Sequence, residues 1–433
     1  MIDYKKFKIE VLDPISPTFC VSKWHQADFW LESGTTSSCH LPSPHKIDLF
    51  EVERNVQTLH NTKEKIHQKQ LMLQGDKPDG CSNCWQVEEL DSDAISERIG
   101  SSYNMQEYQN DFTNLDLSEN HIPAKVTVAF ESYCNFTCSY CDASQSSSWA
   151  TDLKINGPYK RIFGDSRNTY QRLGTSNRLS PEQYQFVSNK FTEYVITNLS
   201  EIKFIRCLGG EPLISNVFWK FLNTLIEHDC SNIVLSIVTN LSDVARINKF
   251  LSKYQHKFKR IAINASIETI GKRGEFLRTG FKWEKFQDNL YHLLDKDVDL
   301  NIIATYPGIA VDGMVEFLNW YNQYRDRISL DLYRLRFPNF QAIQVLPTEL
   351  KKIYLIQIEE WIDQNREYFN TAIFNVGLEN IVTILKDECT IYDNVGIETL
   401  QQSAKEYYKQ YADRHKHNIR NTFSEPLANW ILN

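Results

Sequence analysis

Short apolar segments alternate with amphipathic segments through the middle of the chain, and no other feature of the sequence constrains the fold as strongly. The apolar segments predict strands at residues 124–130, 202–208, 232–238, 261–266, 299–305 and 342–346. Between them, segments such as 217–228 and 283–294 have the apolar spacing of helices. Because buried strands that alternate with helices form parallel sheets, the sequence predicts an α/β fold with a partial (β/α)6 barrel.

A long polar stretch separates the first two of these strands. A helix is predicted to follow it from Ser180, because Ser180 and Gln183 have the spacing of a capping box and Pro181 suits the first turn. The stretch itself is predicted to be either a lid or peptide groove, or a plain surface insertion. Its large side chains include Trp149, Tyr159, Arg161, Arg167 and Tyr170.

The regions on either side of the barrel differ from it in composition. Residues 1–115 have few segments typical of strands, a polar helical stretch at 48–73 and four cysteines, which favour a small domain organised by a metal. Residues 348–433 have the pattern of helices. We therefore expect three domains: an N-terminal metal domain at 1–115, the barrel at 116–347 and a helical C-terminal region at 348–433.

Charge and hydropathy exclude several classes of protein. The net charge of −8 argues against general binding to nucleic acid. No apolar run is long enough to cross a bilayer, and the first residues are charged where a signal peptide is apolar. We expect a cytoplasmic protein that binds neither nucleic acid nor a membrane. In a reducing compartment, ten cysteines that fall largely into clusters favour metal binding over disulfides.

The first cluster is Cys134, Cys138 and Cys141, spaced CxxxCxxC on the loop after the first predicted strand. Three thiolates can ligate three irons of a [4Fe–4S] cluster and leave the fourth iron open for chemistry. Barrels of this kind place their chemistry on such loops. The alternative is part of a zinc site whose remaining ligand lies elsewhere in the chain.

CNFTCSYC, followed by LGGEP (208–212) after the second strand, resembles the radical S-adenosylmethionine superfamily. The resemblance implies that Cys134, Cys138 and Cys141 ligate a [4Fe–4S] cluster whose open iron chelates S-adenosylmethionine. It further implies that Tyr140 lies beside the adenine of the cofactor and that Gly209, Gly210, Glu211 and Pro212 receive its amino group. Ser266 and Glu268 would bind the ribose, and Arg278 would bind the carboxylate. Asn240 would also belong to the cofactor site, in a role left open.

Each of these assignments has a structural alternative. LGGEP could form only a tight turn, and Ser266 and Glu268 could simply end a strand. Arg278 could be a solvated charge at a helix end. The family often has Asp where this chain has Glu268.

The second cluster is Cys20, Cys39, Cys81 and Cys84, enough ligands for a closed metal site. The region resembles the auxiliary-cluster domains called SPASM and twitch, here placed before the barrel. The resemblance implies a second [4Fe–4S] cluster, with Zn²⁺ as the alternative. His40 could replace a ligand but is expected to be an ordinary surface histidine. No metal role is expected for Cys207, Cys230 or Cys389.

The activity implied by the resemblance is reductive cleavage of S-adenosylmethionine to a 5′-deoxyadenosyl radical that abstracts hydrogen from a substrate. A peptide or protein is the expected substrate, which would make this a peptide-modifying enzyme. The alternatives are oxidation or rearrangement of a small molecule such as an amino sugar or nucleoside, and a non-enzymatic metal-binding scaffold. The enzyme would need an external one-electron reductant, similar to flavodoxin or ferredoxin.

Overall fold

Most of the strands expected from the sequence are present in the computed structural model, which describes residues 3–90, 94–108, 121–163, 170, 178–366, 372–386 and 395–433. The chain divides into two units. Unit 1 contains residues 1–131, 177–237 and 253–261, and unit 2 contains residues 132–176, 238–252 and 262–433. Each unit is described separately below. Arg167 and Cys389 lie outside the described residues.

Unit 1 is built on a mixed sheet. Its strands are β1 (Gln26–Trp30), β2 (Thr35–Ser37), β3 (His45–Lys46), β4 (Lys125–Ala129), β6 (Phe204–Leu208) and β7 (Val234–Thr239). Strands β7, β6, β4 and β1 pair in parallel in this order, and β2 and β3 continue the sheet in antiparallel pairs. The parallel pairing confirms the mixed α/β class.

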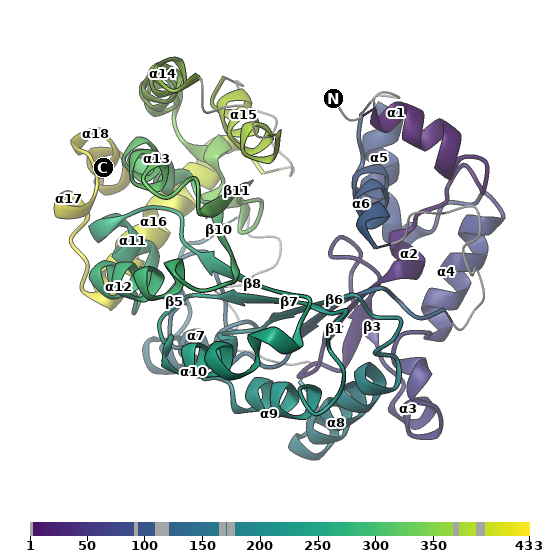
Figure 1. Cartoon of the computed structure of the whole chain (residues 1–433). Coiled ribbons are helices and arrows are strands. Elements are labelled where there is room, and N and C mark those ends of the chain that lie inside the picture. Colours follow the sequence, from purple (N-terminus) through teal and green to yellow (C-terminus); the bar gives the residue numbers. More distant parts are fainter. Residues whose placement is uncertain are drawn as a thin grey trace. The chain divides into compact units, whose positions relative to one another are not determined.

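Helices α8 (Pro181–Thr197) and α9 (Asn216–Leu225) cover one face of this sheet (Figure 1). Val126 and Val128 of β4 are fully buried, and the ring of Phe130 packs edge-on against that of Phe191 in α8. The predicted start of α8 is confirmed, because Ser180 and Gln183 make both hydrogen bonds of a capping box.

Strand β1 was not expected in the N-terminal region. It pairs in parallel with β4, and Asp28 lies opposite Thr127. The sequence pattern of β1 is weak because Gln26 and Asp28 face one side while Ala27 and Phe29 are buried on the other. A run with polar side chains on one face does not have the continuous apolar character expected of a buried parallel strand.

The rest of the N-terminal region is helical. Its helices are α1 (Tyr4–Phe7), α2 (Ser22–His25), α3 (Leu49–Arg54), α4 (Lys63–Leu73), α5 (Ser82–Leu90) and α6 (Glu97–Asn104). The prediction of one helical stretch at 48–73 is wrong in detail, because Asn55 and Thr62 each cap a new helical segment. Phe19, Trp24 and Trp85 belong to an apolar core that also contains Cys20 and Cys84, and Cys81 packs against it.

Unit 2 contains three parallel strands, β8 (Arg260–Ser266), β10 (Asp299–Tyr306) and β11 (Ile328–Arg334). The predicted strand at 342–346 is wrong, since Ile343–Val345 forms a 3₁₀ turn. The sixth strand of the predicted barrel series is β11, whose apolar residues alternate with polar ones along ISLDLYR. Such half-polar strands give a weaker signal than continuous apolar runs.

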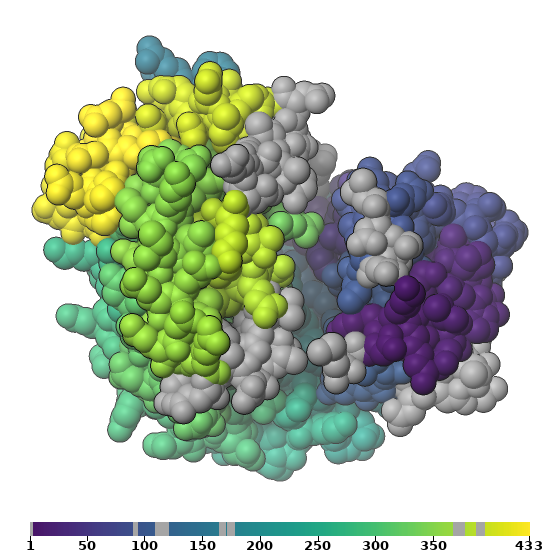
Figure 2. All heavy atoms as spheres, turned by 90° about the horizontal axis from the view of Figure 1, so that it is seen from above, coloured from purple at the N-terminus to yellow at the C-terminus, as the bar shows by residue number. Residues whose placement is uncertain are grey.

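The remaining helices of unit 2 lie around these strands and after them. They are α7 (Ser147–Asn156), α10 (Ala245–Tyr254), α11 (Gly271–Leu277), α12 (Trp283–Leu294), α13 (Met314–Asn322), α14 (Thr348–Gln364), α15 (Ala372–Lys386), α16 (Ile397–His415), α17 (Ile419–Thr422) and α18 (Glu425–Leu432). The helical character predicted after residue 347 is therefore confirmed. In Figure 2 these last helices, yellow-green to yellow, lie next to one another on the surface. No helix in the described ranges combines the length and apolar character needed to cross a membrane.

Candidate metal and cofactor sites

The first cysteine group lies on a loop with little regular structure of its own. Cys138 is in the two-residue strand β5 (Thr137–Cys138), which pairs antiparallel with β9 (Arg278–Thr279). The amide of Cys141 donates to the carbonyl of Cys138 at 3.0 Å, so the loop turns back on itself. Cys134, Cys138 and Cys141 are all free thiols, and they lie close enough to influence one another electrostatically.

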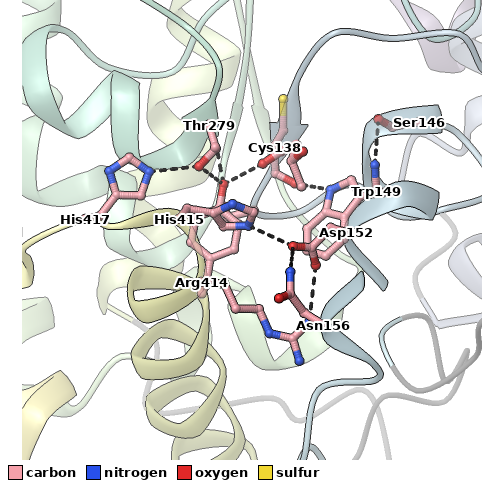
Figure 3. Close-up of polar contacts among 12 residues, drawn as sticks. Cys138, Ser146, Trp149, Asp152, Asn156, Thr279, Arg414, His415 and His417 are labelled. Atoms are coloured by element: carbon pink, nitrogen blue, oxygen red, sulfur yellow. Dashed lines mark hydrogen bonds and ion pairs between the residues drawn. The ribbon is translucent and has the colours of Figure 1, made fainter. Parts of the chain in front are cut away.

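The peptide carbonyls of this loop accept hydrogen bonds from distant aromatic side chains. Trp149 Nε1 donates to the carbonyl of Cys138 at 2.9 Å, and Tyr411 Oη donates to that of Thr137 at 2.5 Å. Figure 3 shows Trp149 beside Cys138. The carbonyl of Ser139 accepts from Tyr170, Tyr407 and Gln341. These hydrogen bonds fix the backbone of the loop through its carbonyls and do not use the cysteine sulfur atoms.

An ion pair ties the same aromatic side chains to the C-terminal helix α16. Asp152 of α7 is buried and lies 3.2 Å from Nη1 of Arg414, which follows Tyr407 and Tyr411 on α16 (Figure 3). The ring of Trp149 packs against those of Tyr159 and Tyr170. All three rings are buried, so they are part of a core and do not line an exposed groove.

Three of the predicted cofactor-binding residues form one buried network. Glu268 accepts from Nε of Arg278 at 2.8 Å and also from Nη2, a bidentate pair. Tyr140 Oη donates to Glu268 at 2.6 Å, and Nη1 of Arg278 lies 3.8 Å from Sγ of Cys138. Burial raises the pKa of the Cys138 thiol to about 12, while the Arg278 charge opposes that rise. Arg278 is therefore not a solvated helix-end charge.

Asn240 is connected to the cysteine loop rather than standing alone at its strand end. Its Nδ2 donates to Asn135 at 2.9 Å, and its Oδ1 accepts from the amide of Ser242 at 2.9 Å. Asn135 in turn donates to the Ser242 hydroxyl at 3.0 Å. Ser266 is half-buried at the last position of β8.

The LGGEP segment is in unit 1, directly after β6. Gly209 has φ of +145°, and a Cβ there would lie 2.7 Å from the carbonyl oxygen of Glu131, so only glycine fits. The amide of Gly210 donates to the same oxygen at 2.8 Å. Glu211 is buried, and its Oε1 accepts from the amide of Leu213 at 3.0 Å in the 3₁₀ turn that begins at Pro212. The segment is thus a tight turn with a buried carboxylate.

The second cysteine group lines one cavity in unit 1. Cys20, Cys39, Cys81 and Cys84 all face a space of about 20 Å³, above the roughly 10–15 Å³ that one water needs. All four are free thiols. They come from four separate segments of the chain, of which only those of Cys81 and Cys84 are close in sequence.

Two buried cations accompany these thiols. Lys23 and Arg98 line the same cavity, and both charges oppose the rise that burial causes in the pKa of Cys20. Arg98 forms an ion pair with Glu88 at 2.7 Å and donates to the carbonyl of Phe19. Burial also raises the pKa of Cys84, to about 12, and that of Cys39. Burial therefore favours the protonated form of Cys20, Cys39 and Cys84 unless a cation binds them.

Within the described residues, no three cysteine, histidine or carboxylate side chains lie close enough to share a single metal ion. His40 is exposed, and Cys207 and Cys230 are buried away from both groups. Sequence reasoning missed the residues that hold the first cysteine loop, notably Asn135, Gln341 and Tyr411. Their only signal in the sequence is the density of tyrosines in EYYKQY (406–411).

No known family model matches this sequence, and no curated protein matches it either. Among solved structures, native anSMEcpe with bound AdoMet gives a TM-score of 0.37 at 15% identity, over 57% of this chain and 62% of that one. Streptococcus suis SuiB bound to S-adenosylmethionine gives a TM-score of 0.37 at 13% identity, over 75% of this chain and 65% of that one. SuiB bound to precursor peptide SuiA gives a TM-score of 0.37 at 13% identity, over 79% of this chain and 70% of that one. The match therefore covers less than two thirds of the length of the first two proteins, and scores this low establish neither fold nor function.

Replacing Tyr411 with phenylalanine tests the support of the cysteine loop. The change keeps the ring but leaves the buried carbonyl of Thr137 without this donor, so the free energy of unfolding should fall by about 1–3 kcal/mol. Denaturant titration measures the loss. Tyr291→Phe, which alters an exposed tyrosine of the same unit, is the matched control and should change little. Equal stability of the two variants would contradict the proposed support.

Proposed function

We propose that this protein is a radical S-adenosylmethionine enzyme that abstracts hydrogen from a peptide or protein substrate. The observation that supports this most is the CxxxCxxC loop, in which distant side chains bond to the backbone carbonyls and none of the three cysteines forms a disulfide. A purely structural loop would have no need of three thiols placed together, and burial raises the pKa of Cys138 and Cys141 because it removes solvent from the thiolate form.

The three thiols suit a cluster better than a single ion. In a [4Fe–4S] cluster each thiolate ligates a different iron, so the sulfur atoms need not converge on one point. This agrees with the absence of a single-ion ligand set among the described residues. When bound, such a cluster with S-adenosylmethionine supplies a reductive cleavage that gives a 5′-deoxyadenosyl radical.

The chain's own residues would bind the cofactor and orient it. Cys134, Cys138 and Cys141 would ligate iron, and Tyr140 would contact the adenine. Arg278, already paired with Glu268, would place positive charge beside the Cys138 thiolate. We propose that Ser266 and Glu268 contact the ribose and that Arg278 contacts the carboxylate of the cofactor. The ion pair between Arg278 and Glu268 already uses some of the hydrogen-bonding atoms of both side chains.

In unit 1, the LGGEP turn would receive the cofactor's amino group. Gly209 and Gly210 allow a ligand to approach the backbone closely. Glu211 uses one oxygen to cap the following turn, and a carboxylate has lone pairs for a further donor such as an ammonium. Pro212 fixes the first position of that turn, and Asn240 remains in the set through its bond to the cysteine loop.

The N-terminal cysteines would form a second, closed metal site. Four thiols around one cavity, with Lys23 and Arg98 beside them, suit a negatively charged tetrathiolate centre. A [4Fe–4S] cluster suits these thiols because each would ligate a different iron. Zn²⁺ is the alternative, and it would require the four sulfur atoms to converge further, since no three such side chains of the described residues lie close enough to share one ion. We assign this site to the domain at 1–115, the radical chemistry to the barrel at 116–347, and support of the cysteine loop to the region at 348–433. A cytoplasmic location and an external flavodoxin- or ferredoxin-like reductant complete the proposal.

Replacing Cys134, Cys138 and Cys141 together with alanine should abolish reductive cleavage of S-adenosylmethionine, because the open-iron cluster cannot assemble. The measurement is 5′-deoxyadenosine formed by anaerobically reconstituted protein with a strong reductant. Cys230→Ala, at a buried cysteine outside both groups, is the control and should remain active. Formation of 5′-deoxyadenosine by the triple variant would refute the proposed function.

Glu211→Gln should weaken binding of S-adenosylmethionine, since an amide can still accept from Leu213 but offers the ammonium no charge. Losing a charged partner of about 1.5–3 kcal/mol corresponds to roughly ten- to hundredfold weaker affinity. Equilibrium binding to the reconstituted protein measures this, with the exposed Glu201→Gln as control. Unchanged affinity would mean that LGGEP serves only as a turn.

The variant that lacks the three barrel cysteines should still bind metal at the N-terminal site. Residual iron with sulfide would identify a second cluster, and zinc alone would identify a structural tetrathiolate site. Replacing Cys81 and Cys84 with serine in that variant should then remove about one equivalent of the centre, because two of its four thiolates are lost. Metal that survives this further change would show that the N-terminal cysteines are not its ligands.

A further inference from the structure

One face of the unit 1 sheet is polar where three parallel strands lie side by side. Asp28 of β1, Thr127 of β4 and Arg206 of β6 are in register, so their side chains form a row across the strands. Lys125 precedes Thr127 by two residues on β4 and therefore faces the same side. The opposite face is apolar and covered by α8 and α9 (Figure 1).

Lys125 and Arg206 are half-buried cations that have no anionic partner among the described residues of the chain. The ammonium of Lys125 lies 5.7 Å from the ring centre of Phe204 and makes no hydrogen bond or ion pair there. Nε of Arg206 is buried and has no hydrogen-bond partner. Each of these groups normally has a partner when it is removed from water.

Carboxylates in the surroundings favour the charged form of Lys125 but make no ion pair with it among the described residues. Asp28 is the carboxylate in the row, and it already accepts from Nε2 of Gln26 at 3.2 Å. Glu97 and Glu107 also act on the Lys125 charge, and Glu107 pairs with Arg260 at 3.5 Å. Burial and the neighbouring Arg206 charge both lower the pKa of Lys125, which means that the two cations repel each other.

We propose that Lys125 and Arg206 form a binding site for an oxyanion, a carboxylate or phosphate group carried by the substrate. A planar guanidinium with an unused Nε–H matches the two oxygens of such a group, and the ammonium adds a second charge close by. An oxyanion would satisfy the orphan donor and cancel the repulsion in one step. Thr127, between Asp28 and Arg206, separates the site from the one carboxylate in the row.

This inference rests on the proposed function in one respect: it takes the anion to be a chemical group of the enzyme's substrate. The site itself is independent of the cysteines, because every residue in it belongs to unit 1. A carboxylate would come from an acidic side chain or C-terminus of a peptide. A phosphate would indicate a phosphorylated small molecule instead.

The test is anion-dependent stability of the purified protein, without S-adenosylmethionine or reductant. The melting temperature is measured against increasing inorganic phosphate, or succinate, with chloride at matched ionic strength as the reference. We expect a saturable rise with at least one anion, because a ligand that binds only the folded state stabilises it. Saturation with succinate indicates a carboxylate, and saturation with phosphate alone indicates a phosphorylated substrate.

The variants Arg206→Gln and Lys125→Met should lower the apparent affinity for that anion by about tenfold or more, as expected for loss of a charged hydrogen bond. Without anion, Lys125→Met should match or exceed the wild-type melting temperature, because it removes a repelled and partly buried charge. The control Arg260→Gln alters an exposed arginine of the same unit and should retain the anion response.

The proposal is overturned if neither anion gives a saturable shift, or if the shift persists in both variants. It is also overturned if both variants melt below wild type without anion, which would indicate a purely structural role. Failure here would leave the cleavage of S-adenosylmethionine untouched as a separate question. Conversely, an inactive enzyme with a normal anion response would remove the proposed function and keep the binding site.

Discussion

The structure of unit 2 depends on the hydrogen bonds that aromatic side chains make to the carbonyls of Thr137, Cys138 and Ser139. A loop of this kind has almost no regular structure to satisfy its own backbone, and buried carbonyls without donors are costly. Trp149 from α7 and Tyr411 from α16 supply donors, and their rings pack within the same aromatic core. Helix α16 therefore supports the cysteine loop, although more than 250 residues separate Tyr411 from that loop.

Both cysteine groups have a buried arginine beside a thiol, and in each case a glutamate pairs with that arginine. Arg278 contacts Cys138 and pairs with Glu268, while Arg98 lies near Cys20 and pairs with Glu88. A lone buried cation would be costly, and the glutamate compensates for it. Since thiolate centres carry negative charge, an arginine held in this way favours their charged form without being free to move away.

The sequence predicted the elements whose signal is local. The strand around Val126 and Val128 has its apolar residues on one face, and the capping box of Ser180 needs only its own turn. The prediction missed β1, which carries Gln26 and Asp28 among only five residues, and β11, which carries charged residues along ISLDLYR, and it failed at 342–346, where apolar residues lie in a 3₁₀ turn. The support of the cysteine loop could not be predicted, because contacts between segments so far apart leave no periodic pattern.

Each unit has a polar face on its sheet, and the two faces differ in how their side chains are paired. On the polar face of unit 2, Nδ2 of Asn301 donates to Asp331 at 2.8 Å and lies 3.3 Å from Oδ1 of Asn264, so these side chains bond to one another across three strands. On the polar face of unit 1, Lys125 and Arg206 repel each other instead. In unit 2 the amides and the carboxylate bond to one another, although Oδ1 of Asn301 has no hydrogen-bond partner there, whereas the like charges of Lys125 and Arg206 in unit 1 would be stabilised by an anion. The pairing of charges, rather than polarity alone, therefore distinguishes a sheet face with a purely structural role from one suited to bind a ligand.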